Sequence, residues 1–270
     1  MAQLMFTIIG ERINTSRKSV QRAVAERDAS FIQDDVRKQQ EAGASYIEVN
    51  AGARIGHEME DMEWLLEVIQ KAATVPLCLD SPDPKVIERA VIMVEKTPMI
   101  NSISLETGRY ESMLSLVNGR DWKVVALCMD DTGMPKSANE IVERAGRLVE
   151  GLEGVGIKRE KIYLDPLIQP ISTDMTKGVV AIESVRGIMQ EYPGVHTVCG
   201  LSNVSYGLPQ RKFLNRIFLS LLVAAGLDSV ILDPLDDAIM AVLTATLTLL
   251  GQDDYCMNYI KSVQAGQIVS

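Results

Sequence analysis

Eight short apolar runs recur along this chain, and each of them is closed by a polar residue. Between the runs lie charged segments with the periodicity of helices. A strand followed by a helix, eight times over, predicts a parallel sheet closed into an α/β (β/α)8 (TIM) barrel. The expected strands are Met5–Gly10, Tyr46–Asn50, Leu77–Asp80, Met99–Asn101, Val124–Met129, Lys161–Asp165, Val195–Leu201 and Ser229–Asp233, and clear helical segments are Ser30–Gly43, Met59–Ala73, Pro84–Lys96, Asn139–Glu153 and Met175–Glu191.

Length and composition agree with this fold. Barrels of about this length fold as one domain, and the sequence contains no linker, so we expect a single domain over residues 1–270. Aromatic residues make up only 5% of the chain, so aliphatic side chains supply most of its hydrophobic content, as buried parallel strands require. A doubly wound open sheet is the alternative, but no Gly-x-Gly-x-x-Gly follows the first apolar run.

The charge and the cysteines narrow the classes of function. A net charge of −9 argues against binding to nucleic acid or to an anionic membrane surface, because both need clustered Lys and Arg. The apolar run Ala238–Leu250 is too short to span a bilayer. The four cysteines form no Cys-x-x-Cys pair and the N-terminus shows no signal-peptide pattern, so we expect a cytoplasmic enzyme with reduced thiols.

Acids and amides stand where the expected strands end, which is where barrel enzymes place their active sites. They are Glu11, Glu48, Asn50, Asp80, Asn101, Asp130, Asp165, Asn203 and Asp233. Any one of them could merely cap the next helix. Together they suit a neutral ligand rich in hydrogen-bond donors, such as the edge of a pterin ring, because carboxylates accept from such donors.

Five ordered motifs at these strand ends resemble the methyltetrahydrofolate:corrinoid protein methyltransferase family. The motifs are Gly10-Glu11-Arg12-Ile13-Asn14, Leu77-Cys78-Leu79-Asp80-Ser81, Met99-Ile100-Asn101-Ser102, Tyr163-Leu164-Asp165-Pro166-Leu167 and Gly200-Leu201-Ser202-Asn203-Val204-Ser205. The resemblance extends over essentially the whole chain. It implies a pterin-binding homodimer that exchanges a methyl group between tetrahydrofolate and a corrinoid (cobalamin) carried by a partner protein.

The same resemblance assigns roles by position. Asp80, Asn101 and Asp165 correspond to the residues that hold the pterin ring, and Glu11 joins them as a pterin-binding residue. Gly200, Ser202 and Arg211 correspond to residues that shape or flank the substrate site. Asn203 corresponds to the residue that hydrogen-bonds the ring nitrogen bearing the methyl group, and it is the expected catalytic residue.

The expected reaction is an in-line displacement at the methyl carbon, in a direction that the sequence does not set. A tertiary amine is a poor leaving group, so a hydrogen bond to the pterin nitrogen eases its departure. Asn203 cannot supply a proton, but it can stabilise the developing charge while solvent provides the proton. Alignment of two large reactants supplies the rest of the rate.

Three other functions remain open. The chain could be a pterin-binding synthase of the dihydropteroate synthase type, although the characteristic sequences of that enzyme are not visible. It could be a non-catalytic pterin-binding subunit of a methyl-transfer complex. It could also take its methyl group from a quaternary amine, but such a ligand has no donors to match the acids and amides and favours an aromatic cage.

A zinc site is the competing chemistry. Cys78, Cys128 and Cys199 fall on the third, fifth and seventh expected strands, where alternate strands can share an interior layer. Three inward thiols with His196 nearby could bind zinc. Cysteine is more often a small apolar filler of a core, so we expect no metal.

Overall fold

The computed structural model describes residues 6–268, and all eight strands pair in parallel in the order β7-β6-β5-β4-β3-β2-β1-β8. The two ends of this order meet at a bridge between Gly200 and Ile231, where the Ile231 amide donates to the Cys199 carbonyl at 2.9 Å. The sheet therefore closes into the predicted (β/α)8 barrel. The strands are β1 Thr7–Asn14, β2 Tyr46–Asn50, β3 Leu77–Asp80, β4 Met99–Leu105, β5 Lys123–Asp130, β6 Ile162–Asp165, β7 His196–Thr197 and β8 Ser229–Leu232.

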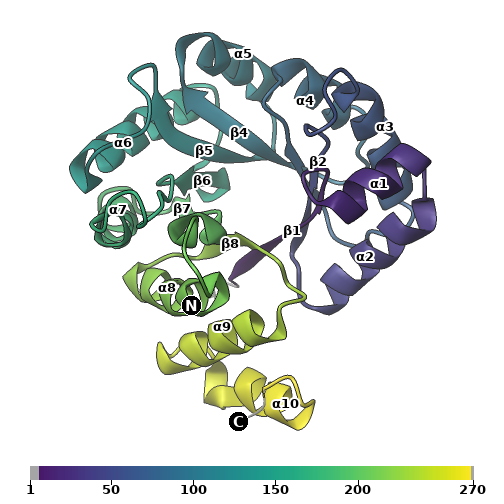
Figure 1. The fold of residues 1–270 in the computed structure, drawn as a ribbon. Coiled ribbons are helices and arrows are strands. Elements are labelled where there is room, and N and C mark those ends of the chain that lie inside the picture. Colours follow the sequence, from purple (N-terminus) through teal and green to yellow (C-terminus); the bar gives the residue numbers. More distant parts are fainter. Residues whose placement is uncertain (1–5, 269–270) are drawn as a thin grey trace.

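Helices surround the barrel, and the last two extend outward beyond α8 (Figure 1). α9 packs on α8, and α10 packs on α9. Among the residues described, no helix is long and apolar enough to cross a membrane. The α-helices are α1 Lys18–Glu26, α2 Ala29–Glu41, α3 Glu58–Ile69, α4 Pro84–Val91, α5 Thr107–Val117, α6 Ala138–Gly154, α7 Lys177–Glu191, α8 Arg211–Ala225, α9 Asp237–Leu249 and α10 Met257–Gln264.

Side chains along each strand alternate between the barrel interior and the surrounding helices. In β2, Tyr46 belongs to the interior cluster, whereas Ile47 and Val49 pack against the helices. The interior cluster is Ile9, Tyr46, Cys78, Met99, Val125, Tyr163, Val198 and Ile231. Because this cluster fills the floor of the barrel, Glu48 and Asn50, which follow Tyr46 on the inward face, lie above it toward the carboxyl end.

The first strand is longer than predicted. We expected it over Met5–Gly10, but it runs on to Asn14, and Met5 lies outside the described residues. Its pairing with β2 shifts register between Gly10 and Ile13. A Cβ atom at Gly10 would lie 2.3 Å from Gln39 Oε1, and that buried side chain accepts a hydrogen bond from the Arg12 amide at 3.4 Å. Glycine therefore admits a glutamine from α2 where the register of β1 changes.

The seventh strand is shorter than the predicted Val195–Leu201. Only His196 and Thr197 belong to the ladder with β6. The backbone then turns into a short 3-10 helix, η2, at Leu201–Ser205. The motif that carries Asn203 is therefore a helical turn at the barrel mouth and not the end of a strand.

Candidate active site at the barrel mouth

A set of buried or half-buried acids and amides comes together at the carboxyl end of the barrel. Its members are Glu11 on β1, Glu48 and Asn50 on β2, Asp80 on β3, Asn101 on β4 and Asp165 on β6. Asn50 Nδ2 donates to Asp80 Oδ2 at 2.7 Å, and Asn101 Nδ2 donates to Glu48 Oε1 at 3.2 Å. The structure thus brings together four sequence-predicted site residues: Glu11, Asp80, Asn101 and Asp165.

The carboxyl groups of this set hold their protons unusually tightly. Burial, and next the negative charge of Asp233, raise the pKa of Glu11 to about 7. Burial also raises the pKa of Asp165 to about 7. The pKa values of Glu48 and Asp80 are raised as well, first by burial and, for Glu48, also by the charges of Asp80 and Glu11. A ligand that donates hydrogen bonds to these groups would favour their ionised forms.

The cations nearest to this set are already engaged by other protein groups. Arg12 makes a bidentate contact with Asp35 of α2 and donates to Asp233 at 2.8 Å. The Arg109 guanidinium donates to the backbone carbonyls of Ser81 at 3.0 Å and Ser102 at 2.7 Å. Both guanidinium groups hold the mouth together and leave the acids to accept from a ligand.

The loop after β7 supplies the remaining predicted site residues. Asn203 lies in η2 with an exposed side chain, and no hydrogen bond of that side chain involves any residue between 6 and 268. A Cβ atom at Gly200 would lie 3.4 Å from Asn203 Nδ2, an ordinary van der Waals distance, so Gly200 adjoins this amide. Asn203 is therefore available to a ligand at the mouth.

Arg211 fastens this loop to the first turn of α8. Its Nη2 donates to the Ser202 carbonyl at 2.7 Å, and its Nε donates to Ser205 Oγ at 3.1 Å. Its positive charge also acts on Glu11, whose pKa it lowers against the stronger effect of burial. The charge that holds the loop therefore also acts on an acid of the buried set.

Three residues of the mouth received no role from the resemblance: Glu48, Asn50 and Arg109. Glu48 and Asn50 were expected at the barrel mouth as strand-end residues, whereas Arg109 was not expected there. Glu48 and Asn50 contact Asn101 and Asp80, two residues to which the resemblance did assign a role. The signal for both was the two-residue spacing within β2, which points them inward together. No motif indicated Arg109, because its position depends on how α5 packs over β4 and brings the guanidinium to the Ser81 and Ser102 carbonyls.

Asp130 was expected among the residues of the mouth, and this expectation is wrong. Its carboxylate pairs with Arg144 at 3.1 Å and Arg147 at 3.3 Å, and both partners lie on α6. The pairing of β5 with β4 is irregular near its end, where Leu105 lies opposite Asp130. Asp130 therefore faces the helical layer and not the ligand.

The three cysteines do not gather in one interior layer. Cys78 belongs to the interior cluster, but Cys128 and Cys199 pack in two other clusters among residues of the surrounding helices. Among residues 6–268 no group of three His, Cys, Asp or Glu side chains is placed to hold a metal ion. The inward direction expected for Cys128 is thus wrong, since the neighbouring Leu127 faces inward instead.

A pocket of about 700 Å³ opens beside Asp80 at the same end of the barrel. Leu127 and Met129 give it an apolar wall, and Glu106 and Arg109 give it a charged rim. Its volume lies within the range of small-molecule sites. The barrel mouth therefore offers a buried polar recess with an adjoining open pocket.

The fold is that of a (β/α)8 barrel whose mouth offers buried acids and amides as hydrogen-bond acceptors. Residues 10–233 match the family model described as "Pterin binding enzyme". That match covers most of the chain, and the chain therefore belongs to the pterin-binding enzyme family.

Two kinds of relatives share sequence with this chain. It is 35% identical over 263 residues to the methylcorrinoid:tetrahydrofolate methyltransferase of Eubacterium limosum, covering 97% of each chain. It is 31% identical over 237 residues to methionine synthase of Mycobacterium tuberculosis, covering 83% of this chain and 20% of that protein.

Solved structures of dihydropteroate synthases share the fold. The Xanthomonas albilineans enzyme in complex with 7,8-dihydropteroate superposes with a TM-score of 0.67 at 18% identity, covering 100% of this chain and 97% of that chain. The Coxiella burnetii enzyme in complex with pteroic acid superposes with a TM-score of 0.63 at 13% identity, covering 90% of this chain and 94% of that chain. At such identities the likeness establishes the barrel and not the reaction.

Proposed function

We propose that this chain, acting as one domain, moves a methyl group between tetrahydrofolate and the cobalt of a corrinoid held by a separate protein. The observation that carries the proposal is the buried acid and amide set, which opens to the same mouth as Asn203. The near full-length similarity to a methylcorrinoid:tetrahydrofolate methyltransferase supports it.

The acid and amide set matches the chemistry of a pterin. The ring presents an exocyclic amine and adjacent ring NH groups, which donate to carboxylates such as Asp80 and Asp165. Asn101 can both donate and accept, as the mixed edge of the ring requires. Glu11 lies on β1, where the positive charge of Arg211, which holds the η2 loop, acts on its carboxyl group.

The chain's own residues act on the pterin nitrogen. A corrinoid carried by the partner protein would supply or accept the methyl group at its cobalt. Asn203 donates a hydrogen bond to the nitrogen that gains or loses the methyl group and stabilises its changing charge. Gly200 adjoins that amide, while Arg211 holds the loop through Ser202 and Ser205. The barrel thereby fixes one reactant for an in-line transfer.

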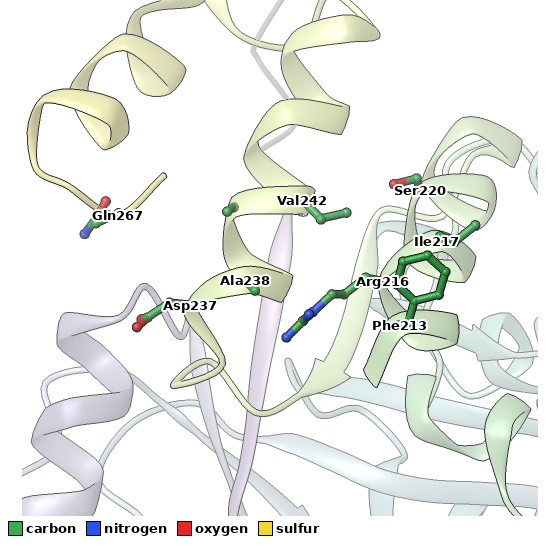
Figure 2. A pocket seen from close by; sticks show the side chains of 9 residues that line it. Phe213, Arg216, Ile217, Ser220, Asp237, Ala238, Val242 and Gln267 are labelled. Carbon is green, nitrogen blue, oxygen red and sulfur yellow. The ribbon is translucent and has the colours of Figure 1, made fainter. Parts of the chain in front are cut away.

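We also propose that the chain forms a homodimer through α8 and α9. Phe213, Ile217 and Leu221 recur at every fourth position of α8 and are all exposed. A groove of about 550 Å³ lies between α8 and α9, with Phe213 and Ile217 beside Val242 of α9 (Figure 2).

The charges of this groove suit a second copy of the chain. Arg216 extends from α8 toward α9 and pairs through Nη2 with Asp236 at 3.0 Å, while its buried Nε has no hydrogen-bond partner within residues 6–268 (Figure 2). Asp237, on the opposite side of the groove, makes no ion pair with any residue of that range. A two-fold axis through the groove would bring Arg216 of one copy toward Asp237 of the other.

Equilibrium titration with methyltetrahydrofolate tests the ligand. The wild-type chain should bind it, and Asp80→Ala should weaken binding at least about tenfold, as expected for the loss of a charge-assisted hydrogen bond. Asp130→Asn is the matched control, because this strand-end acid faces α6, and its affinity should equal that of the wild type. Formation of dihydropteroate from 4-aminobenzoic acid and an activated dihydropterin would instead support a synthase.

A further inference from the structure

Glu48 is the acid of the mouth whose role the proposed function leaves open. Only 4% of its surface is exposed, and its carboxyl group lies on the inward face of β2 below Asn50. Asn101 Nδ2 donates to Glu48 Oε1 at 3.2 Å across the barrel interior. β3 lies between these two strands, so the contact links side chains that are not neighbours in the sheet.

We propose that Glu48 is a positioning residue of the pterin site, which fixes the Asn101 amide by accepting its Nδ2–H and so turns Oδ1 toward the cavity. The inference rests on the proposed function, because it assigns the pterin as the group that Oδ1 meets. Among residues 6–268, no hydrogen bond uses Asn101 Oδ1. An amide held at one end presents a defined acceptor to the donors of a pterin edge.

The charge state of Glu48 follows from its neighbours. Asp80 and Cys78 face it from β3 and Glu11 faces it from β1, and none of these groups is a cation. Burial, and then the charges of Asp80 and Glu11, raise its pKa well above the usual value. Adjacent carboxyl groups do not all ionise readily, so burial and these charges favour the protonated form of Glu48.

A neutral Glu48 has a consequence for Asp80. The negative charge of the pair remains on Asp80, whose Oδ2 accepts from Asn50 Nδ2 at 2.7 Å. Asp80 can then meet the pterin as a carboxylate, while Asn101 meets it as a fixed amide. Ionisation of Glu48 at alkaline pH would place a second negative charge beside Asp80 and loosen this arrangement.

The test is a calorimetric titration with methyltetrahydrofolate between pH 6 and 9 on the wild type, Glu48→Leu and Glu48→Gln. Glu48→Leu should weaken binding at least about tenfold, because Asn101 loses its acceptor. Glu48→Gln should recover most of that loss, since its amide oxygen can still accept. Relative to Glu48→Gln, which cannot ionise, the wild type should lose affinity toward the alkaline end. Glu11 and Asp165, whose pKa values are raised to about 7, titrate in both proteins alike.

Thermal unfolding of each variant shows whether it is folded. Asp130→Asn serves as the matched control, and its affinity should follow the same pH profile as that of the wild type. If Glu48→Gln binds as weakly as Glu48→Leu, or if its affinity follows the same pH profile as that of the wild type, the positioning role is wrong although the pterin still binds. Unchanged affinity in Glu48→Leu likewise overturns it. A wild-type chain that binds no pterin overturns both this inference and the proposed function.

Discussion

The burial of Asp165 at the barrel mouth destabilises the folded protein. It is buried at the end of β6, and its hydrogen bond among the described residues comes from the Leu167 amide at 2.7 Å. This one bond does not offset burial, which raises the pKa of Asp165 to about 7. Such a group stores unfavourable energy that a ligand with hydrogen-bond donors can release.

The raised pKa of Asp165 predicts a pH-dependent stability. Between about pH 4 and 7 the unfolded chain loses this proton while the folded protein keeps it, so the free energy of unfolding falls as pH rises through that window. Asp165→Asn carries no such proton, so it should lose less stability between pH 4 and 8. The difference between the two proteins should reach up to about 4 kcal/mol in urea unfolding. Parallel pH profiles would contradict the assignment.

Asn203 gives the sharpest prediction for catalysis. Asn203→Ala should lower the rate of methyl transfer about 100-fold, as losing one donor to a developing charge does in other enzymes. Affinity for methyltetrahydrofolate should change far less, because the acid and amide set remains. Single-turnover kinetics and equilibrium titration separate the two effects. An unchanged transfer rate would remove Asn203 from the mechanism.

At the scale of elements, the position of η2 depends on Arg211 in the first turn of α8. Arg211→Ala should release the Ser202 carbonyl and Ser205 Oγ and slow methyl transfer about tenfold by displacing Asn203. The adjacent Lys212→Ala is the control, since Lys212 pairs with Asp236 and does not contact the loop. The measurement is the transfer rate of both variants under saturating pterin. Equal rates for the two would show that Arg211 does not hold the loop.

The sequence predicted the barrel better than it predicted the loops. The alternation of β2, β3 and β6 is local, so their bounds follow from the pattern, and the inward direction of Asp80 and Asp165 follows with them. The end of β1 depends instead on Gln39 of α2, and the early end of β7 depends on β8 through Ile231. Contacts between distant segments decide such ends, and a periodic pattern does not contain them.

For the site as well, local patterns predicted some residues, and contacts between distant segments decided the others. Motifs indicated Glu11, Asp80, Asn101 and Asp165, which the structure brings to one mouth. The pattern also suggested Asp130 and an inward Cys128, but Val125 and Leu127 are the inward residues of β5, so the alternation of this strand turns both toward the helices. Glu48 was visible as an inward residue, whereas its contact with Asn101 needed the curvature of the closed sheet.

At the scale of the whole molecule, the exposed face of α8 predicts the oligomeric state. The wild type should elute as a dimer in size-exclusion chromatography with light scattering. Phe213→Glu combined with Ile217→Glu should give a folded monomer, because two charges would be buried in an apolar interface. Ile92→Glu is the control, since Ile92 is exposed after α4, away from this face, and should leave the dimer intact. A monomeric wild type would contradict the proposed interface.

The most direct test of the methyl transfer is a spectroscopic assay with methyltetrahydrofolate and chemically reduced cobalt(I) cobalamin. Free cobalamin replaces the partner protein, so the barrel is tested alone, and Asn203→Ala serves as the matched variant. The proposed function predicts that the cobalt(I) band disappears at a rate proportional to the wild-type protein and that methylcobalamin forms in equal amount. A protein that binds methyltetrahydrofolate but converts no cobalamin, either free or carried by a corrinoid protein, would contradict it.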